Sequence, residues 1–122
     1  MAYRIVNMAE DPRSGQFAYF RAMADPWAGI TVEVDITEFH AALNGRPFFL
    51  SFLYALTRAA NAVPELRRRL LDGQVVEFDR CCPSYTAMKD SGVYVYCLVD
   101  SGLLPYEDFL ADGKRRQAEA LK

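Results

Sequence analysis

The sequence has little of what a catalytic or metal centre normally needs. Its 122 residues include one histidine, His40, and three cysteines. No nucleophile lies near His40 in the sequence, so we interpret it as a structural or surface residue, although recruitment by a distant serine or cysteine stays open. Cys81, Cys82 and Cys97 are odd in number and lack the spacing of metal ligands. This favours buried, reduced thiols over a disulfide or a zinc site.

Phosphate-binding glycine motifs, long apolar runs and an excess of either charge are absent too. Neither a Walker pattern nor GxGxxG occurs. The formal net charge is −2, whereas general nucleic-acid binders normally carry a basic face. The three arginines at 67–69 are expected on a solvated helix face. Residues 1–8 contain no apolar signal region, and no stretch has transmembrane length. We therefore expect a cytoplasmic protein that binds neither nucleic acid nor membranes.

What is present is an ordinary globular composition, with 52% hydrophobic and 25% charged residues. This length predicts a single domain over residues 1–122. Asp11 and Pro12 are typical of a helix start and predict a helix over 11–23. Residues 30–36 then alternate between apolar and polar side chains, which predicts a strand with one buried face. A short helix over 38–43 follows.

The second half of the chain predicts a long helix followed by strands and a last helix. Residues 47–63 are apolar nearly all round, which is typical of a mostly buried helix. Their one polar stripe consists of Ser51, Tyr54, Arg58 and Asn61. A short helix through the arginines, a turn at 72–73, strands at 74–79, 84–89 and 92–99, and a helix from Pro105 complete the order. This order predicts an α+β fold, a mostly antiparallel sheet with helices packed on one face.

Aromatic residues are concentrated on the first predicted helix and on two late strands. They are Phe17, Tyr19, Phe20, Tyr85, Tyr94 and Tyr96. Aromatic side chains in such places form either the core or the wall of a pocket for a flat, apolar ligand, and both interpretations stay open.

Five segments resemble, in order and spacing, the type A chloramphenicol acetyltransferases. Residues 13–37, RSGQFAYFRAMADPWAGITVEVDIT, resemble their R-x-x-x-F-x-[FY]-[FY] helix and a strand ending in DIT or DIS. Residues 48–70 are similar to their F-x-P-x-x-x-Y-x-x-x-x-x-x-N helix and E-[LF]-R turn. Residues 72–88, DGQVVEFDRCCPSYTAM, are similar to their D-[GD]-x-[LV]-x-x-[WY]-D-x-x-x-P-x-[FY]-T segment, and the helix from Pro105 to their next one. The resemblance covers essentially the whole chain.

The resemblance implies the first half of a chloramphenicol-acetyltransferase-like α/β sandwich, because those enzymes are about twice this length. Their second half carries an HHxxxDG motif, whose histidine takes a proton from the drug hydroxyl that attacks the thioester of acetyl-CoA. The 122 residues contain no such motif, and His40 matches neither its context nor its position. We therefore expect acyl transfer from acetyl-CoA, a co-substrate rather than a tightly bound cofactor, to a hydroxyl of a small aromatic substrate. The catalytic base is missing from this chain, and no metal site is expected.

The resemblance also implies where the substrate binds. The family's drug-side positions correspond here to Arg13, Tyr19, Phe20, Thr86 and Tyr94. The aromatic pair stands in reverse order to the family's usual Phe-Tyr. On the cofactor side, Pro47 and Phe49 stand where the family tends to have Lys and Tyr, and Leu50 stands where it has proline.

Family members form trimers, with the pocket at a subunit boundary. A first half alone would leave a sheet edge and an apolar face uncovered. We therefore expect a homo-oligomer, a trimer by resemblance, or pairing with a second chain that carries the missing half. Three hypotheses stay open: an acetyltransferase-like protein completed by another chain, a catalytically inactive small-molecule-binding or oligomerisation module, and an unrelated domain whose aromatics are all core.

Overall fold

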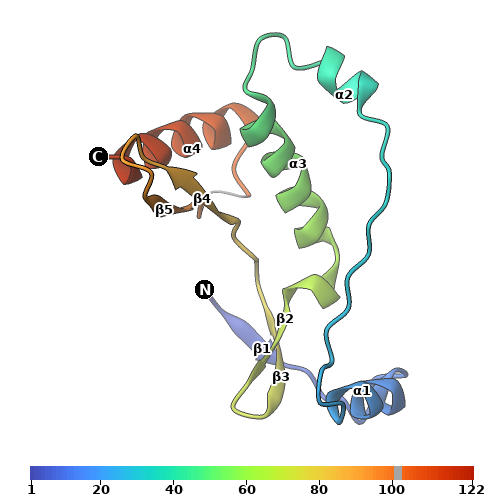
Figure 1. The fold of residues 1–122 in the computed structure, drawn as a ribbon. Helices are drawn as coiled ribbons and strands as arrows, with labels where there is room; N and C mark the ends of the chain where they lie inside the picture. The colour runs from blue at the N-terminus through green and yellow to red at the C-terminus, as the bar shows by residue number, and fades with distance from the viewer. Residues whose placement is uncertain (101–102) are drawn as a thin grey trace.

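Two small antiparallel sheets and four α-helices make up the computed structural model, which describes residues 1–100 and 103–122 (Figure 1). The elements are β1 (Tyr3–Ile5), α1 (Ser14–Arg21), α2 (Thr37–Ala41), α3 (Phe48–Ala62), the 3₁₀ helix η1 (Pro64–Arg67), β2 (Arg68–Leu71), β3 (Gln74–Phe78), β4 (Ser84–Met88), β5 (Tyr94–Leu98) and α4 (Tyr106–Ala120). The predicted α+β class is confirmed. The strands form two separate sheets, with the orders β1-β3-β2 and β4-β5.

The main core lies where α3 and α4 pack together beside β5. Its buried members are Leu50, Leu53, Val99, Phe109 and Leu110. Helix α3 follows Pro47, whose backbone is extended, and ends before Pro64, because a residue preceding proline disfavours the helical conformation. Gly113 sits at the closest approach, where an added Cβ would lie 3.1 Å from Cδ2 of Leu50. The glycine weakens α4 as a helix but permits its packing on α3.

We expect Gly113→Val to lower the free energy of unfolding by about 2 kcal/mol, because the added methyl groups would overpack the contact with Leu50. Ala111→Val is the matched control, since Ala111 is exposed on the same helix. It should cost only the difference in helix propensity, about 0.5 kcal/mol. Urea unfolding of both variants measures the difference. Equal losses would contradict the close packing of α3 on α4.

The prediction of a solvated arginine helix at 67–69 is only partly correct, because the 3₁₀ helix η1 ends at Arg67 and the next two arginines lie in β2. Arg68 begins β2 and lies opposite Glu77 of β3. Glu77 is buried, and its Oε2 accepts hydrogen bonds from Arg68 Nε at 3.3 Å and Arg4 Nη2 at 3.0 Å. Burial raises the pKa of Glu77, but these hydrogen bonds and the charges of Arg4 and Arg67 outweigh it and lower the pKa overall. The predicted solvation of Arg67 and Arg68 was wrong because the buried Glu77 carboxylate needs positive charges nearby. The pairing of β2 with β3 places Arg68 opposite it.

The predicted strand over 30–36 does not form in this chain. The segment is extended and crosses one side of the molecule between α1 and α2 (Figure 1), but it pairs with no strand among the described residues. Its expected buried face is open to solvent, with Ile30 90% exposed and Val32 and Val34 each 70% exposed. The prediction was wrong for this chain because a strand needs a neighbour to pair with, and the described part of the chain provides none.

Helix α3 is also less buried than predicted. Its buried side consists of Leu50, Ser51, Leu53 and Thr57. Four large apolar side chains of the same helix are exposed, namely Phe48, Phe49, Phe52 and Leu56. Phe49 still contacts the ring of Tyr85. Phe48 and Phe52 contact the ring of Phe39, so these apolar side chains are only partly covered within the described residues. Within residues 1–100 and 103–122, no helix combines the length and apolar character that crossing a membrane requires.

Smaller differences concern the N-terminal region and the thiols. Strand β1 was not predicted, because three residues give too little alternation to detect. Helix α1 begins at Ser14, and the carboxylate of Asp11 accepts the backbone N–H of Arg13 in the turn before it. All three cysteines are free, as predicted; Cys97 is buried, but the other two are half-buried.

Candidate functional site

Three of the five predicted substrate positions lie together at α1. Arg13 and Phe20 line a hollow of about 410 Å³, with Phe17 of the same helix and Arg68 and Val75 of the first sheet. Tyr19 is 65% exposed, and its ring packs edge-on against that of Phe20 with the centroids 5.4 Å apart. With the aromatic pair in reverse order, Phe20 lines the hollow, and Tyr19 lies outside it, exposed to solvent.

Arg13 already has acidic partners in this hollow. Its Nη2 donates to Glu65 Oε1 at 2.6 Å, and its Nε donates to Asp11 Oδ1 at 3.4 Å. The hydrogen bond to Glu65 and the charges of both carboxylates raise the pKa of Arg13, and the same bond lowers the pKa of Glu65. Arg13 therefore fastens the start of α1 to η1, and it binds a ligand only in addition to these contacts.

The other two predicted positions share the outer face of the β4–β5 hairpin. Thr86 pairs across the hairpin with Tyr96, and Met88 pairs with Tyr94. Because directly opposed and alternate residues share a face, all four side chains lie on the exposed side. Thr86 also borders a hollow of about 510 Å³ beside Phe49 and Lys114.

The structure does not bring the two groups together within this chain. Helix α1 and the β4–β5 hairpin lie at opposite ends of the molecule (Figure 1). Arg13 and Phe20 line one hollow, and Thr86 borders another. Assignment of these five residues to a substrate pocket therefore stays a prediction, and such a pocket would need surfaces beyond one copy of the described residues.

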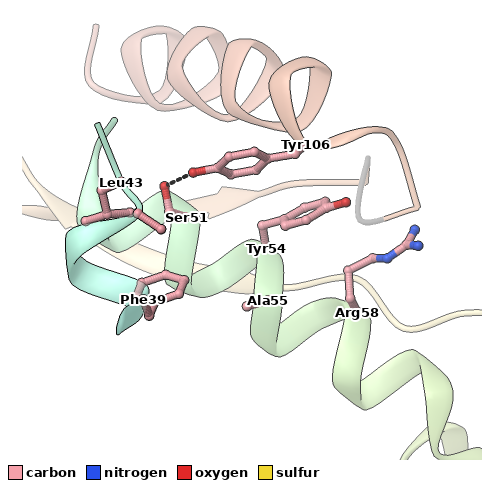
Figure 2. A pocket seen from close by; sticks show the side chains of 8 residues that line it. Phe39, Leu43, Ser51, Tyr54, Ala55, Arg58 and Tyr106 are labelled. Atoms are coloured by element: carbon pink, nitrogen blue, oxygen red, sulfur yellow. Dashed lines mark hydrogen bonds between the residues drawn. The ribbon is translucent and has the colours of Figure 1, made fainter. Parts of the chain in front are cut away.

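A third hollow lies where α2, α3 and the start of α4 meet (Figure 2), and we call it the α2–α3–α4 hollow. Its volume is about 430 Å³, and it is lined by Phe39, Ala42, Leu43, Ser51, Tyr54, Ala55, Arg58 and Tyr106. Ser51 is 1% exposed, and its Oγ lies 2.6 Å from Tyr106 Oη. The ring of Tyr54 lies 5.1 Å from that of Tyr106, and the Arg58 guanidinium lies 5.9 Å from the Tyr54 ring centre.

Three of these lining residues form a pattern in the sequence for which no role was predicted. Ser51, Tyr54 and Arg58 are members of the polar stripe at helical spacing on α3. The stripe does not simply face water: Ser51 bonds Tyr106, and its last member, Asn61, bonds the backbone of Cys81 in both directions. A polar stripe on an otherwise apolar helix could have indicated this hollow.

The described residues offer binding surfaces but little acid–base chemistry. His40 is exposed on α2, with its ring 6.4 Å from that of Phe48. Cys82 Sγ donates to Asp100 Oδ1 at 2.8 Å. Burial and that carboxylate raise the pKa of Cys82, so the neutral, weakly nucleophilic thiol dominates at pH 7. In residues 1–100 and 103–122, no three His, Cys, Asp or Glu side chains are placed to hold a metal ion.

Comparison with known proteins gives consistent matches. The family model "CAT: Chloramphenicol acetyltransferase" matches residues 1–112. A chloramphenicol acetyltransferase of Klebsiella sp. is 32% identical over 90 residues, which are 72% of this chain and 41% of that protein, and one of Escherichia coli gives the same values. A solved chloramphenicol acetyltransferase structure, 29% identical, matches 99% of this chain and 57% of its own with a TM-score of 0.83. The chain thus spans less than half the length of these curated relatives.

Proposed function

The chain belongs to the chloramphenicol acetyltransferase family, and on that premise we propose that it forms the substrate-side part of an acetyltransferase. The reaction is acetyl transfer from acetyl-CoA, bound as a co-substrate, to a hydroxyl of a small aromatic molecule. The catalytic base comes from a polypeptide segment outside these 122 residues. The observation that carries the proposal is structural similarity to a chloramphenicol acetyltransferase over 99% of the chain.

The exposure of the substrate positions supports this proposal. Tyr19 is 65% exposed and Tyr94 is 64% exposed. The hypothesis of an unrelated domain whose aromatics are all core is therefore wrong. In the proposed assembly, each exposed group would supply one wall of a pocket and the partner surface would supply the rest.

The partner in this proposal is a second polypeptide that adds a strand to the segment 30–36. Apolar side chains line one face of that segment, and Thr31, Glu33 and Asp35 lie on the other. An antiparallel pair of two copies centred on Glu33 would oppose two glutamates, and one centred on Val34 would oppose Glu33 and Asp35. Directly opposed like charges are destabilising. A shifted register centred on Val32 would avoid this by pairing Glu33 with Thr31. In the two registers named first, the charges favour a partner strand with apolar residues on one face and neutral or basic residues on the other.

A second candidate function is a catalytically inactive small-molecule-binding module. The α2–α3–α4 hollow supports it, because all the residues that line this open hollow belong to this chain (Figure 2).

A chimera tests the proposed function. In it, residues 1–112 replace the matching segment of the Escherichia coli relative. We expect the chimera to acetylate chloramphenicol. Tyr19→Ala should raise the KM for chloramphenicol about tenfold, equivalent to about 1.4 kcal/mol, without changing the KM for acetyl-CoA.

The matched control for Tyr19→Ala is Trp27→Ala, since Trp27 is 87% exposed and outside the predicted site. Both substitutions should change the free energy of unfolding by less than about 0.5 kcal/mol. A folded chimera that acetylates no chloramphenicol would contradict the proposal. Equal changes of KM in both variants would contradict the assignment of Tyr19.

A further inference from the structure

The α2–α3–α4 hollow contains none of the five predicted substrate positions, so its occupant is a separate question. We propose that it binds a planar aromatic carboxylate about 10 Å long, with the carboxylate on Arg58 and the far end at the hydroxyls of Ser51 and Tyr106. This inference does not depend on acetyl transfer. It rests on the walls of the hollow, the charge at one end and the hydroxyl pair at the other.

The walls suit a flat ring. Tyr54 and Tyr106 come from α3 and α4, and Phe39 comes from α2 (Figure 2). Phe39 makes edge-on contacts with Phe48 and Phe52, each with centroids 6.0 Å apart, and these contacts place its ring beside α3. The volume of about 430 Å³ lies within the range of small-molecule sites. Aromatic walls that are already ordered bind planar ligands with little cost in side-chain entropy.

Arg58 supplies an available positive charge at one end. Its guanidinium lies over the ring of Tyr54, and none of the ion pairs among the described residues includes it. Arg46, by contrast, stands over the ring of Tyr106 but is neutralised by Glu107, with Nε 2.7 Å from Oε1. A guanidinium without an acidic partner can bind a carboxylate with two parallel hydrogen bonds.

The hydroxyls of Ser51 and Tyr106 supply a polar contact at the other end. Their mutual hydrogen bond uses one of the two hydroxyl protons, so one proton and several lone pairs remain for a ligand. Ser51 and Arg58 are seven residues apart on α3. Seven residues are about two helical turns, so the two Cα atoms lie on one face about 10 Å apart along the axis, and the Arg58 guanidinium reaches over the Tyr54 ring from the far end of that span. That spacing favours a two-ring acid with a polar substituent opposite the carboxylate over a single-ring acid.

Calorimetric titration of the 122-residue chain with 6-hydroxy-2-naphthoate tests the proposal. We expect binding at one site. Arg58→Gln should weaken it at least tenfold, and Ala55→Leu should abolish it by filling the hollow from an exposed helix position. The uncharged amide of the same acid should bind the wild type at least tenfold more weakly and should be insensitive to Arg58→Gln.

Matched controls are Ala59→Leu, an exposed alanine of α3 outside the hollow, and Arg115→Gln, an exposed arginine of α4. Neither should change the affinity, and circular dichroism should show all four variants folded. Absence of binding to the wild type would overturn the proposal. So would binding that survives Ala55→Leu, which would place the acid on the partly covered apolar face. Loss with Ala55→Leu but not with Arg58→Gln would overturn the carboxylate assignment.

Discussion

Purified alone, the 122-residue chain is expected to form no acetylated chloramphenicol above the uncatalysed rate. A positioned general base contributes about 10²–10⁴-fold to such reactions, and the chain's one histidine, His40, is exposed on α2 away from both predicted substrate groups. Cys82 is no substitute, because burial and Asp100 raise the pKa of its thiol. Product should be measured by chromatography, because the half-buried free thiols of Cys81 and Cys82 can react with a thiol reagent.

Addition of a polypeptide that carries the HHxxxDG half of the family should restore acetylation by about two to four orders of magnitude. Replacement of the motif's first or second histidine by alanine in that polypeptide identifies the base. Turnover by the 122-residue chain alone that disappears in His40→Ala would contradict the proposal and make His40 the base.

The elements that the sequence predicts well are those whose signals are local. Proline on both sides defines α3, and Asp72 and Gly73, with φ of 48° and 79°, form the predicted hairpin turn. The pairing of strands was harder to predict, because register depends on residues far apart in the chain. Arg68 appeared to belong to a helix until its position opposite Glu77 placed it in a strand.

The candidate sites divide in the same way. The five substrate positions were predicted from the family resemblance. A local pattern could not have predicted them, because the residues around Thr86 carry no signal that relates Thr86 to α1. The α2–α3–α4 hollow had a local indication in the stripe of Ser51, Tyr54 and Arg58. The stripe faces a hollow because Tyr106 covers one side of it. Tyr106 is 55 residues from Ser51, and its hydroxyl bonds Ser51 only when α4 packs on α3.

The double variant Val32→Asp/Val34→Asp is expected to leave the isolated chain stable and to abolish its association with the second half. Both side chains are 70% exposed in the chain, so the change in free energy of unfolding should be below about 0.5 kcal/mol. In a completed sheet the same side chains would be buried. Loss of about 2 kcal/mol of apolar burial at each position would weaken association about a thousandfold. Titration with the labelled HHxxxDG polypeptide measures this affinity.

The matched control is Thr31→Ser with Glu33→Gln, which changes the polar face of the same segment and should leave association within about tenfold of the wild type. Sedimentation of the chain alone then separates the two partner hypotheses. A monomer mass at every concentration, with strong binding of the second half, is the result that the charges of Glu33 and Asp35 predict. A different result would be a wild-type trimer that the double variant converts to monomer. It would mean that copies of this chain cover the segment 30–36 themselves. The gain from burying Ile30, Val32 and Val34 would then exceed the repulsion between the acidic faces of the copies.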